Sequence, residues 1–157
     1  MIDDKSITLT YPPANQYSGG GVNNLIDGIR CSPDFKVGGW LGFEKNNLEA
    51  LIDLREVKPV SSFGAGFLQD INSWIFMPSQ VEFFVSENGM DYHSAGIVKN
   101  DIPQDKDGVF LKTFETKTAP VNARYVKIIA TNIGNCPAGH KGQGGAAWMF
   151  ADEIIVK

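Results

Sequence analysis

The segment Val81-Glu82-Phe83-Phe84-Val85-Ser86-Glu87-Asn88-Gly89-Met90-Asp91-Tyr92 decides the fold class. Val81, Phe83 and Val85 occupy every second position, which is the spacing of a strand with one buried face. Asn88-Gly89 follows directly, and this dipeptide is a strong hairpin signal because both residues tolerate a positive φ angle. The segment therefore predicts an antiparallel β-hairpin.

Other short runs along the chain share the β-branched and apolar composition of strands. They are Ile7–Thr10, Leu48–Leu54, Val109–Thr116, Arg124–Ala130 and Glu153–Val156. Clusters of Gly, Pro, Asn and Asp separate these runs, and no stretch of twelve or more residues has helical spacing, although Asn23–Ile29 can form a single turn. The pattern predicts an all-β sandwich or barrel, with one domain spanning residues 1–157.

Composition narrows the classes of function. The chain of 157 residues has 14 Lys and Arg against 18 Asp and Glu, a net charge of −4, which disfavours nucleic acid as a partner. No run approaches the roughly 20 apolar residues of a membrane span. Cys31 and Cys136 lack the paired spacing of a metal or redox site, and the sequence leaves open whether they are free thiols or one disulfide. Common catalytic motifs are absent, so we expect no enzymatic activity.

Four motifs occur in an order that identifies a resemblance. They are Asn23–Gly28 followed by Gly39-Trp40, then Leu51–Leu54, then Val81–Tyr92, and finally Ala123–Ile128 with Ala151–Val156. A chain with these motifs resembles the discoidin, or coagulation-factor type C, domain family, which includes family-32 carbohydrate-binding modules. The resemblance covers Asn23 to Val156. It implies a galactose-binding-like β-sandwich, or jelly roll, of antiparallel strands.

Three finer segments point to a particular setting for such a module. Gly66–Asp70, Ser73–Phe76 and Trp148–Glu153 resemble the C-terminal module of secreted bacterial β-hexosaminidases of chitobiase type. The resemblance implies a monomeric, non-catalytic accessory module cut from a longer periplasmic, cell-surface or secreted glycosidase. Its expected partners are the parent's catalytic domain and a glycan of N-acetylhexosamine or galactose type.

The resemblance also implies a structural Ca²⁺ ion. Asp27 and Glu153 would supply side-chain oxygens, while Asn24, Ile29 and Ser32 would supply backbone carbonyls. Calcium prefers such oxygen ligands. The alternative is an Asp-Gly turn and a surface Glu without an ion.

Two loops are the expected sugar site. The first, Gly66–Trp74, contains Gln69, Asp70, Asn72 and Trp74, and the second, Asn132–Trp148, adds His140. A sugar ring needs an aromatic plane and fixed polar groups, which these residues could supply. Trp74 could equally belong to the core, where Trp40 and Trp148 are also expected.

Two rival functions follow from the same residues. Sugar-binding relatives often have Arg where Gln69 stands, which favours a structural module that packs on the catalytic domain without binding sugar. The third alternative is adhesion to protein or lipid, for which Phe35-Lys36-Val37 is the candidate loop tip.

Overall fold

Two long strands, β3 (Leu48–Asp70) and β6 (Val109–Ala130), organise the molecule. The structure is a computed structural model, and it describes residues 6–157. The other strands are β1 (Ser6–Leu9), β2 (Leu41–Glu44), β4 (Gln80–Ser86), β5 (His93–Lys99) and β7 (Trp148–Val156). Short 3₁₀ helices are η1 (Asn15–Tyr17), η2 (Val22–Ile26) and η3 (Ile71–Ser73). All pairs among these strands are antiparallel. The strand order in the sheet is β2-β7-β3-β6-β4-β5, and β1 also pairs with β3.

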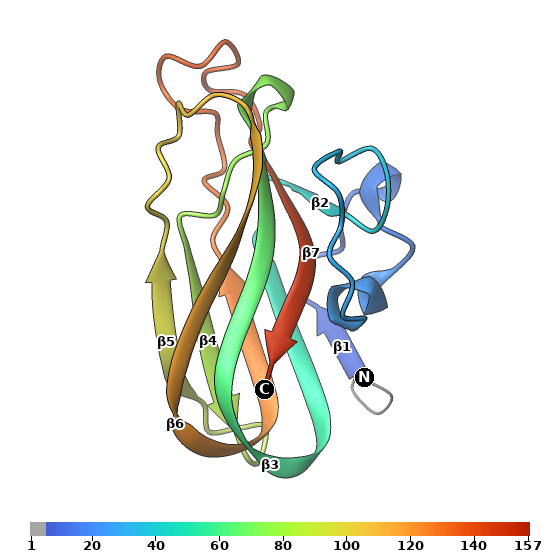
Figure 1. The fold of residues 1–157 in the computed structure, drawn as a ribbon, viewed down its shortest axis with the longest axis vertical. Coiled ribbons are helices and arrows are strands. Elements are labelled where there is room, and N and C mark those ends of the chain that lie inside the picture. Colours follow the sequence, from blue (N-terminus) through green and yellow to red (C-terminus); the bar gives the residue numbers. More distant parts are fainter. Residues whose placement is uncertain (1–5) are drawn as a thin grey trace.

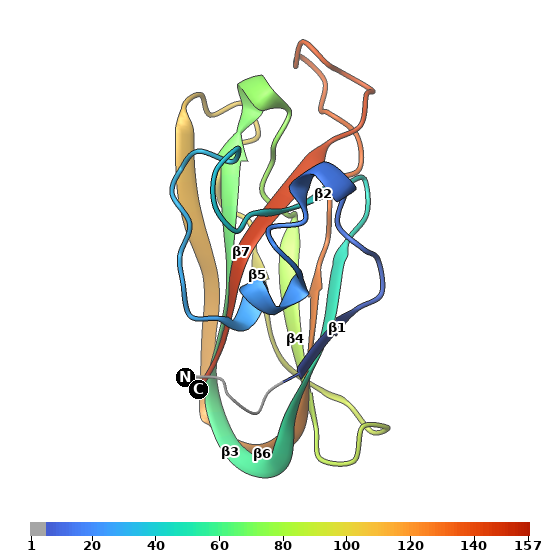
Figure 2. The ribbon, with the colours of Figure 1, turned by 90° about the vertical axis from the view of Figure 1, so that its right-hand side faces the viewer.

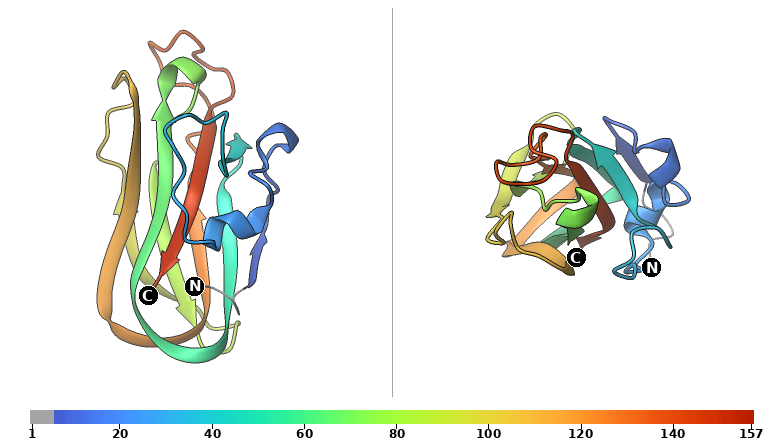
Figure 3. Two further views of the ribbon diagram at one scale, coloured as in Figure 1. Left: turned by 45° about the vertical axis from the view of Figure 1, so that its right-hand side comes forward. Right: turned by 90° about the horizontal axis from the view of Figure 1, so that it is seen from above.

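β3 and β6 run side by side through both layers of the sandwich (Figure 1). Their pairing register breaks between Asp53 and Lys58 and again between Val60 and Ser62, where both strands bend at the lower end (Figure 3). In one layer, the first half of β3 pairs with β1 and the second half of β6 pairs with β4, which pairs with β5. In the other layer, the second half of β3 pairs with β7, which pairs with β2. The predicted all-β sandwich and the Asn88-Gly89 hairpin between β4 and β5 are confirmed.

The main core lies between the two layers. Alternating apolar residues of the strands meet there, and rings of Phe67 and Phe114 pack edge to face with centroids 5.6 Å apart. A second cluster contains Trp40, which is 2% exposed, and Phe150. Trp148 is half-buried against this cluster. Phe35 packs edge to face on Phe150 and is therefore not a free loop tip, whereas Val37 is exposed.

Three local predictions need correction. Val109–Thr116 and Arg124–Ala130 are one continuous strand, and Leu41–Glu44 forms a strand that the pattern did not reveal. Gly66–Asp70, predicted as a loop, belongs to β3. Gly66 sits in this strand because a Cβ there would overlap Oδ1 of Asp152 and lie 2.8 Å from Nη2 of Arg30, so glycine leaves room for this ion pair.

The two ends of the sandwich differ in what they carry. The start of β1 and the end of β7 lie toward the lower end, whereas the 71–79, 100–108 and 132–147 loops gather at the upper end (Figure 2). Among residues 6–157, no helix is long and apolar enough to cross a membrane.

Candidate functional site

A cavity of about 690 Å³ opens between the three upper loops. Residues of η3, here called its floor, and of the 100–108 and 132–147 loops, here called its two walls, line this cavity. The lining residues are Ile71, Asn72, Gln104, Asp105, Asp107, Pro137, Ala138, Gly139, His140 and Lys141. No Phe, Tyr or Trp is among them, so a ligand would be held mainly by polar contacts.

Gln69 fixes the 100–108 loop from beneath. Its side chain is 1% exposed, and Nε2 donates to the carbonyl of Pro103 at 3.1 Å and to that of Lys106 at 3.4 Å. Its Oε1 accepts the backbone N–H of Met77 at 3.4 Å. All of these contacts are internal, so Gln69 shapes the cavity wall instead of facing it.

Asp70, Ser73 and Trp74 build the tight turn that carries η3. The backbones of Asp70 and Ile75 exchange two hydrogen bonds of 3.0 Å, and Oδ2 of Asp70 accepts the Ser73 hydroxyl at 3.0 Å. Trp74 ends the turn with a φ of 65°, a left-handed conformation that is uncommon for a bulky residue. Packing against the 132–147 loop holds this conformation in place.

The ring of Trp74 lies against the backbone of the 132–147 loop. A Cβ on Gly142 would lie 2.6 Å from this ring, and one on Gly145 would lie 2.9 Å from it. The two glycines therefore let the loop backbone rest on the indole, and the indole is half-buried outside the cavity lining.

His140 ties the 132–147 loop to η3. Its Nε2 is 2.6 Å from the carbonyl oxygen of Ile71, and its Nδ1 accepts the backbone N–H of Gly142 at 2.9 Å. The imidazole also packs edge to face on Trp74 and Phe76. Both ring nitrogens are thus occupied by backbone groups, although the residue borders the cavity.

The charges at the cavity are unevenly distributed. Asp105 and Asp107 stand on one wall, and Oδ1 of Asp107 accepts the side-chain amide of Asn72 at 3.2 Å. Lys141 is the cation on the other wall. Lys106 is not among the lining residues, and its Nζ lies over the ring of Phe110, 4.8 Å from the centroid. The lining therefore carries two carboxylates against one ammonium group.

Two of the five predicted sugar residues, Asn72 and His140, line the cavity. Gln69 lies below it, while Asp70 and Trp74 support the turn beside it. Sequence reasoning missed the acidic wall, Gln104–Asp107, although the Asp- and Pro-rich composition of 101–108 had already indicated a loop. Its position over η3 depends on long-range packing that sequence spacing does not encode.

Cys136 and His140 do not form a nucleophile and base. Both Cys31 and Cys136 are free thiols. Burial raises the pKa of the Cys136 thiol, and its Sγ contacts the carbonyl of Ala146 at 3.6 Å. The ring nitrogens of His140 contact Ile71 and Gly142 instead. The arrangement lacks the activated thiolate that such chemistry requires.

A second polar cluster lies where β7 passes the η2 segment. Gly66 pairs with Glu153 and Phe67 with Ala151, so Asp152 is the extra residue of a β-bulge. The bulge turns Asp152 toward Arg30, whose Nε lies 2.9 Å from Oδ2. Asp152 is fully buried, and its Oδ1 has no hydrogen-bond partner.

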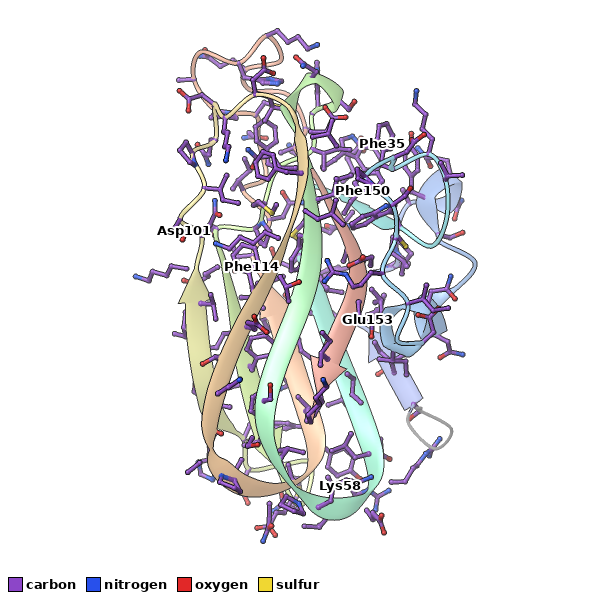
Figure 4. The ribbon with its side chains drawn as sticks, in the orientation of Figure 1. Phe35, Lys58, Asp101, Phe114, Phe150 and Glu153 are labelled. Carbon is purple, nitrogen blue, oxygen red and sulfur yellow. The ribbon has the colours of Figure 1, made fainter. Side chains whose placement is uncertain are left out.

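Glu153 is buried beside the predicted metal loop (Figure 4). Its Oε2 accepts the N–H of Gly28 at 3.1 Å, and Oδ1 of Asp27 accepts the N–H of Ile29 at 2.8 Å. Burial is the largest cause that raises the pKa of Glu153 to about 7, and the negative charge of Asp27 adds to it. A cation between the two carboxylates would remove this unfavourable charge.

The loop contains oxygen donors of the kind that a hard cation takes. Asp27 and Glu153 offer carboxylate oxygens, and Asn24, Ile29 and Ser32 lie in the adjoining turn, with the Ser32 carbonyl already accepting the indole N–H of Trp40 at 2.8 Å. Within residues 6–157, no three His, Cys, Asp or Glu side chains are grouped to hold a metal. An ion here would therefore take most of its ligands from backbone carbonyls, as Ca²⁺ can.

Solved structures share this fold. CpGH89CBM32-5 from Clostridium perfringens, solved in complex with GalNAc-β-1,3-galactose, aligns with a TM-score of 0.61 at 20% identity over 98% of this chain and 95% of that one. The family 32 carbohydrate-binding module of C. perfringens NanJ, in complex with galactose, aligns with a TM-score of 0.56 at 16% identity over 98% and 93%. A striped bass (Morone saxatilis) fucolectin aligns with a TM-score of 0.59 at 22% identity over 97% and 46%. No family model and no curated protein matches the sequence.

The chain therefore has the galactose-binding-like β-sandwich fold of family 32 carbohydrate-binding modules. These identities establish the fold, and function has to be argued from the site.

Proposed function

We propose that the chain is a non-catalytic carbohydrate-binding module whose upper cavity binds a neutral glycan of N-acetylhexosamine or galactose type. The cavity carries the proposal, because its volume of about 690 Å³ lies in the range of small-ligand sites. Two structures with the same fold were solved with GalNAc-β-1,3-galactose and with galactose. The walls of the cavity offer hydrogen-bond acceptors on one side and a donor on the other.

The charge of the cavity supports a neutral ligand. Sugar hydroxyl and acetamide groups can donate to Asp105 and Asp107 and accept from Lys141. A uronic or sialic acid would meet two carboxylates in a protein of net charge −4 and would be repelled.

Binding at this site would be weak, because no Phe, Tyr or Trp ring lines the cavity to stack on a sugar, and the imidazole of His140 is packed on Trp74 and Phe76. Weak binding still serves an accessory module, since tethering to an enzyme raises the effective concentration of that enzyme near its substrate.

The proposal is tested by NMR titration of the labelled chain with N-acetylgalactosamine, N-acetylglucosamine and galactose. Shifts are expected at the amides of Asn72, Asp105 and Lys141. Asn72→Ala should weaken binding, whereas Asn122→Ala, at an exposed position remote from the cavity, should leave it unchanged. Absence of shifts at the upper loops with every sugar overturns the proposal.

The rival proposal is a structural module that binds no sugar. The internal contacts of Gln69 and the packing of Trp74 on Gly142 support it, because these two side chains were expected to contact sugar and contact the protein instead. It predicts no titration shifts, and it predicts that deleting the module lowers the stability of the parent enzyme without changing substrate affinity.

The setting of the module is also proposed. We infer a monomeric accessory domain joined to the catalytic domain of a β-N-acetylhexosaminidase of chitobiase type that acts in the periplasm, at the cell surface or outside the cell. Structures of this fold include modules from a family 31 glycoside hydrolase of C. perfringens, which supports attachment to a glycosidase. Cloning the complete gene and measuring hydrolysis of N-acetylhexosaminides tests the assignment of the parent.

We further propose that a structural Ca²⁺ ion bridges Asp27 and Glu153. The burial of Glu153 and its proximity to a second carboxylate support the proposal. At pH 7.5, Ca²⁺ should raise the melting temperature of the EDTA-treated chain, and Asp27→Asn should abolish the increase. An unchanged melting temperature would contradict the proposal.

A further inference from the structure

The hydrogen bonds of His140 determine its protonation state. A backbone N–H can only donate, so Nδ1, which faces the N–H of Gly142 at 2.9 Å, carries no proton. A carbonyl oxygen can only accept, so Nε2, at 2.6 Å from the oxygen of Ile71, carries the proton. This conformation of the loop therefore contains the neutral Nε2–H tautomer.

We propose that His140 is a positioning residue of the glycan site, and that the affinity of the cavity for sugar falls when its imidazole takes up a second proton. The inference rests on the proposed function. A proton on Nδ1 would point at the N–H of Gly142, and two donors cannot share a hydrogen bond. Gly142 is buried beneath Trp74, so its N–H would lose its hydrogen bond to His140 without free access to water.

The cavity would respond because His140 joins its floor to one of its walls. Ile71, on the floor, and Lys141, on the wall, both line the cavity. The turn around His140 is closed by its N–H donating to Pro137 at 3.1 Å and by Gln143 donating to its carbonyl at 2.9 Å. Loss of the bond to Gly142 would release this turn and change the distance between Lys141 and the acidic wall.

Charged groups around the imidazole come from several elements. Asp105 and Asp107, from the 100–108 loop, line the same cavity, and Lys141 is its neighbour in the chain. Asp70 lies in the turn that carries η3. Trp74 and Phe76, which contact the ring, are uncharged. The two cavity carboxylates also titrate in acid, so their effect has to be separated from that of His140.

The first experiment reads the tautomer directly. Long-range ¹H–¹⁵N NMR spectra at pH 8 should show a protonated Nε2 and an unprotonated Nδ1 for His140. On acidification, the amide signals of Gly139, Lys141 and Gly142 should shift together with the ring signals. The inference is overturned by a mixture of tautomers at pH 8, or by loop amide signals that do not shift when the ring signals titrate. This readout needs no sugar, so it remains decisive if the proposed function fails.

The second experiment measures sugar affinity against pH. As the pH is lowered through the titration of the His140 ring signals seen by NMR, affinity for the best neutral sugar should fall by about fivefold, the effect of one lost hydrogen bond. His140→Asn keeps an acceptor for the N–H of Gly142 and cannot be protonated, so its affinity should not vary with pH. His140→Phe keeps an aromatic ring without either bond and should bind weakly throughout.

Two controls separate other titrating groups. His93→Asn changes the other, exposed histidine and should retain the wild-type pH profile. Asp105→Asn with Asp107→Asn removes two proposed sugar contacts, so it is examined without sugar, and its Gly139, Lys141 and Gly142 amides should still shift with the His140 ring signals. If these amides no longer follow the ring in the double variant, or if His140→Asn keeps the fall in sugar affinity, the carboxylates control the profile and the inference is wrong.

Sugar and proton should also act reciprocally on the site. Saturating sugar should move the titration of the His140 ring signals to lower pH, because a ligand that prefers the neutral form opposes protonation. An unchanged titration in the presence of bound sugar contradicts the inference while leaving the proposed function intact.

Discussion

The side-chain amide of Gln69 lies 3.1 Å from the carbonyl oxygen of Pro103, and this contact connects the end of β3 to the acidic wall of the cavity. A residue expected to contact sugar therefore acts from behind the wall. The shape of the cavity depends on buried contacts as well as on its lining.

Gln69→Leu should lower the free energy of unfolding by about 1–3 kcal/mol, because the carbonyl of Pro103 and the N–H of Met77 would lose a buried partner. Urea unfolding measures the change. Gln16→Leu, at an exposed position, is the matched control and should remain near the wild-type value. Equal stability of the two variants would refute the anchoring role of Gln69.

Gly142→Ala should destabilise the chain by about 1–3 kcal/mol and alter the fluorescence of Trp74, because the added methyl would overlap the indole ring. Gly64→Ala is the matched control, since its Cβ would meet neighbours only at ordinary distances of 3.5 Å and more. If both variants behave like the wild type, Trp74 does not rest on Gly142 in solution.

Arg30→Met should lower the free energy of unfolding by about 2–3 kcal/mol, because it leaves the charge of buried Asp152 without its ion-pair partner. Adding Asp152→Asn should recover part of the loss by removing that charge. Lys58→Met, in an exposed ion pair with Glu56, should change stability by less than about 0.5 kcal/mol. The idea fails if the double variant is no more stable than Arg30→Met alone.

Glu153 gives the metal-free chain a pH dependence whose sign follows from its raised pKa. Between about pH 4.5 and 7 the folded state binds this proton more tightly than the unfolded state, so stability falls as pH rises through that interval. Over the whole interval, a pKa shift of this size lowers the free energy of unfolding by about 3 kcal/mol. Urea unfolding in EDTA should show a decline for the wild type that is smaller for Glu153→Gln. Parallel curves for the two proteins would exclude this assignment.

Asp105→Asn should reduce the discrimination of the cavity against anionic sugars. Glucuronic acid is expected to bind the wild type at least about tenfold more weakly than N-acetylglucosamine, and the variant should narrow that ratio. Glu115→Gln, at an exposed site on β6 outside the cavity lining, is the matched control. Calorimetric titrations at low salt provide the comparison, and an unchanged ratio in Asp105→Asn would contradict the prediction.

Local patterns predicted much of the fold. Alternation in Val81–Ser86 and the Asn88-Gly89 turn produced the observed β4–β5 hairpin, because burial of one face fixes strand register. The continuity of β3 past Leu54 was hidden, since Gly64, Ala65 and Gly66 have low strand propensity. The small size of Gly66 is explained by Arg30 and Asp152, which lie far away in sequence.

The site was less predictable than the fold. Composition marked Asn72 and His140 as polar groups in loops, and both border the cavity. The roles of Gln69 and Trp74 depend on what packs above them. Gln69 meets carbonyls of a loop more than thirty positions away, and Trp74 meets Gly142. Such contacts are set by tertiary packing, which a single sequence does not display.

The sharing of β3 and β6 between both layers has a consequence for how the protein opens. Neither layer can detach while the other persists, because the same two backbones run through both. Unfolding should therefore be cooperative, and amides in the lower halves of β3 and β6 should exchange with solvent through the same global event as those in the upper halves. A sugar bound at the upper loops would then slow hydrogen exchange at the lower end of the molecule, because it would raise the free energy of global unfolding.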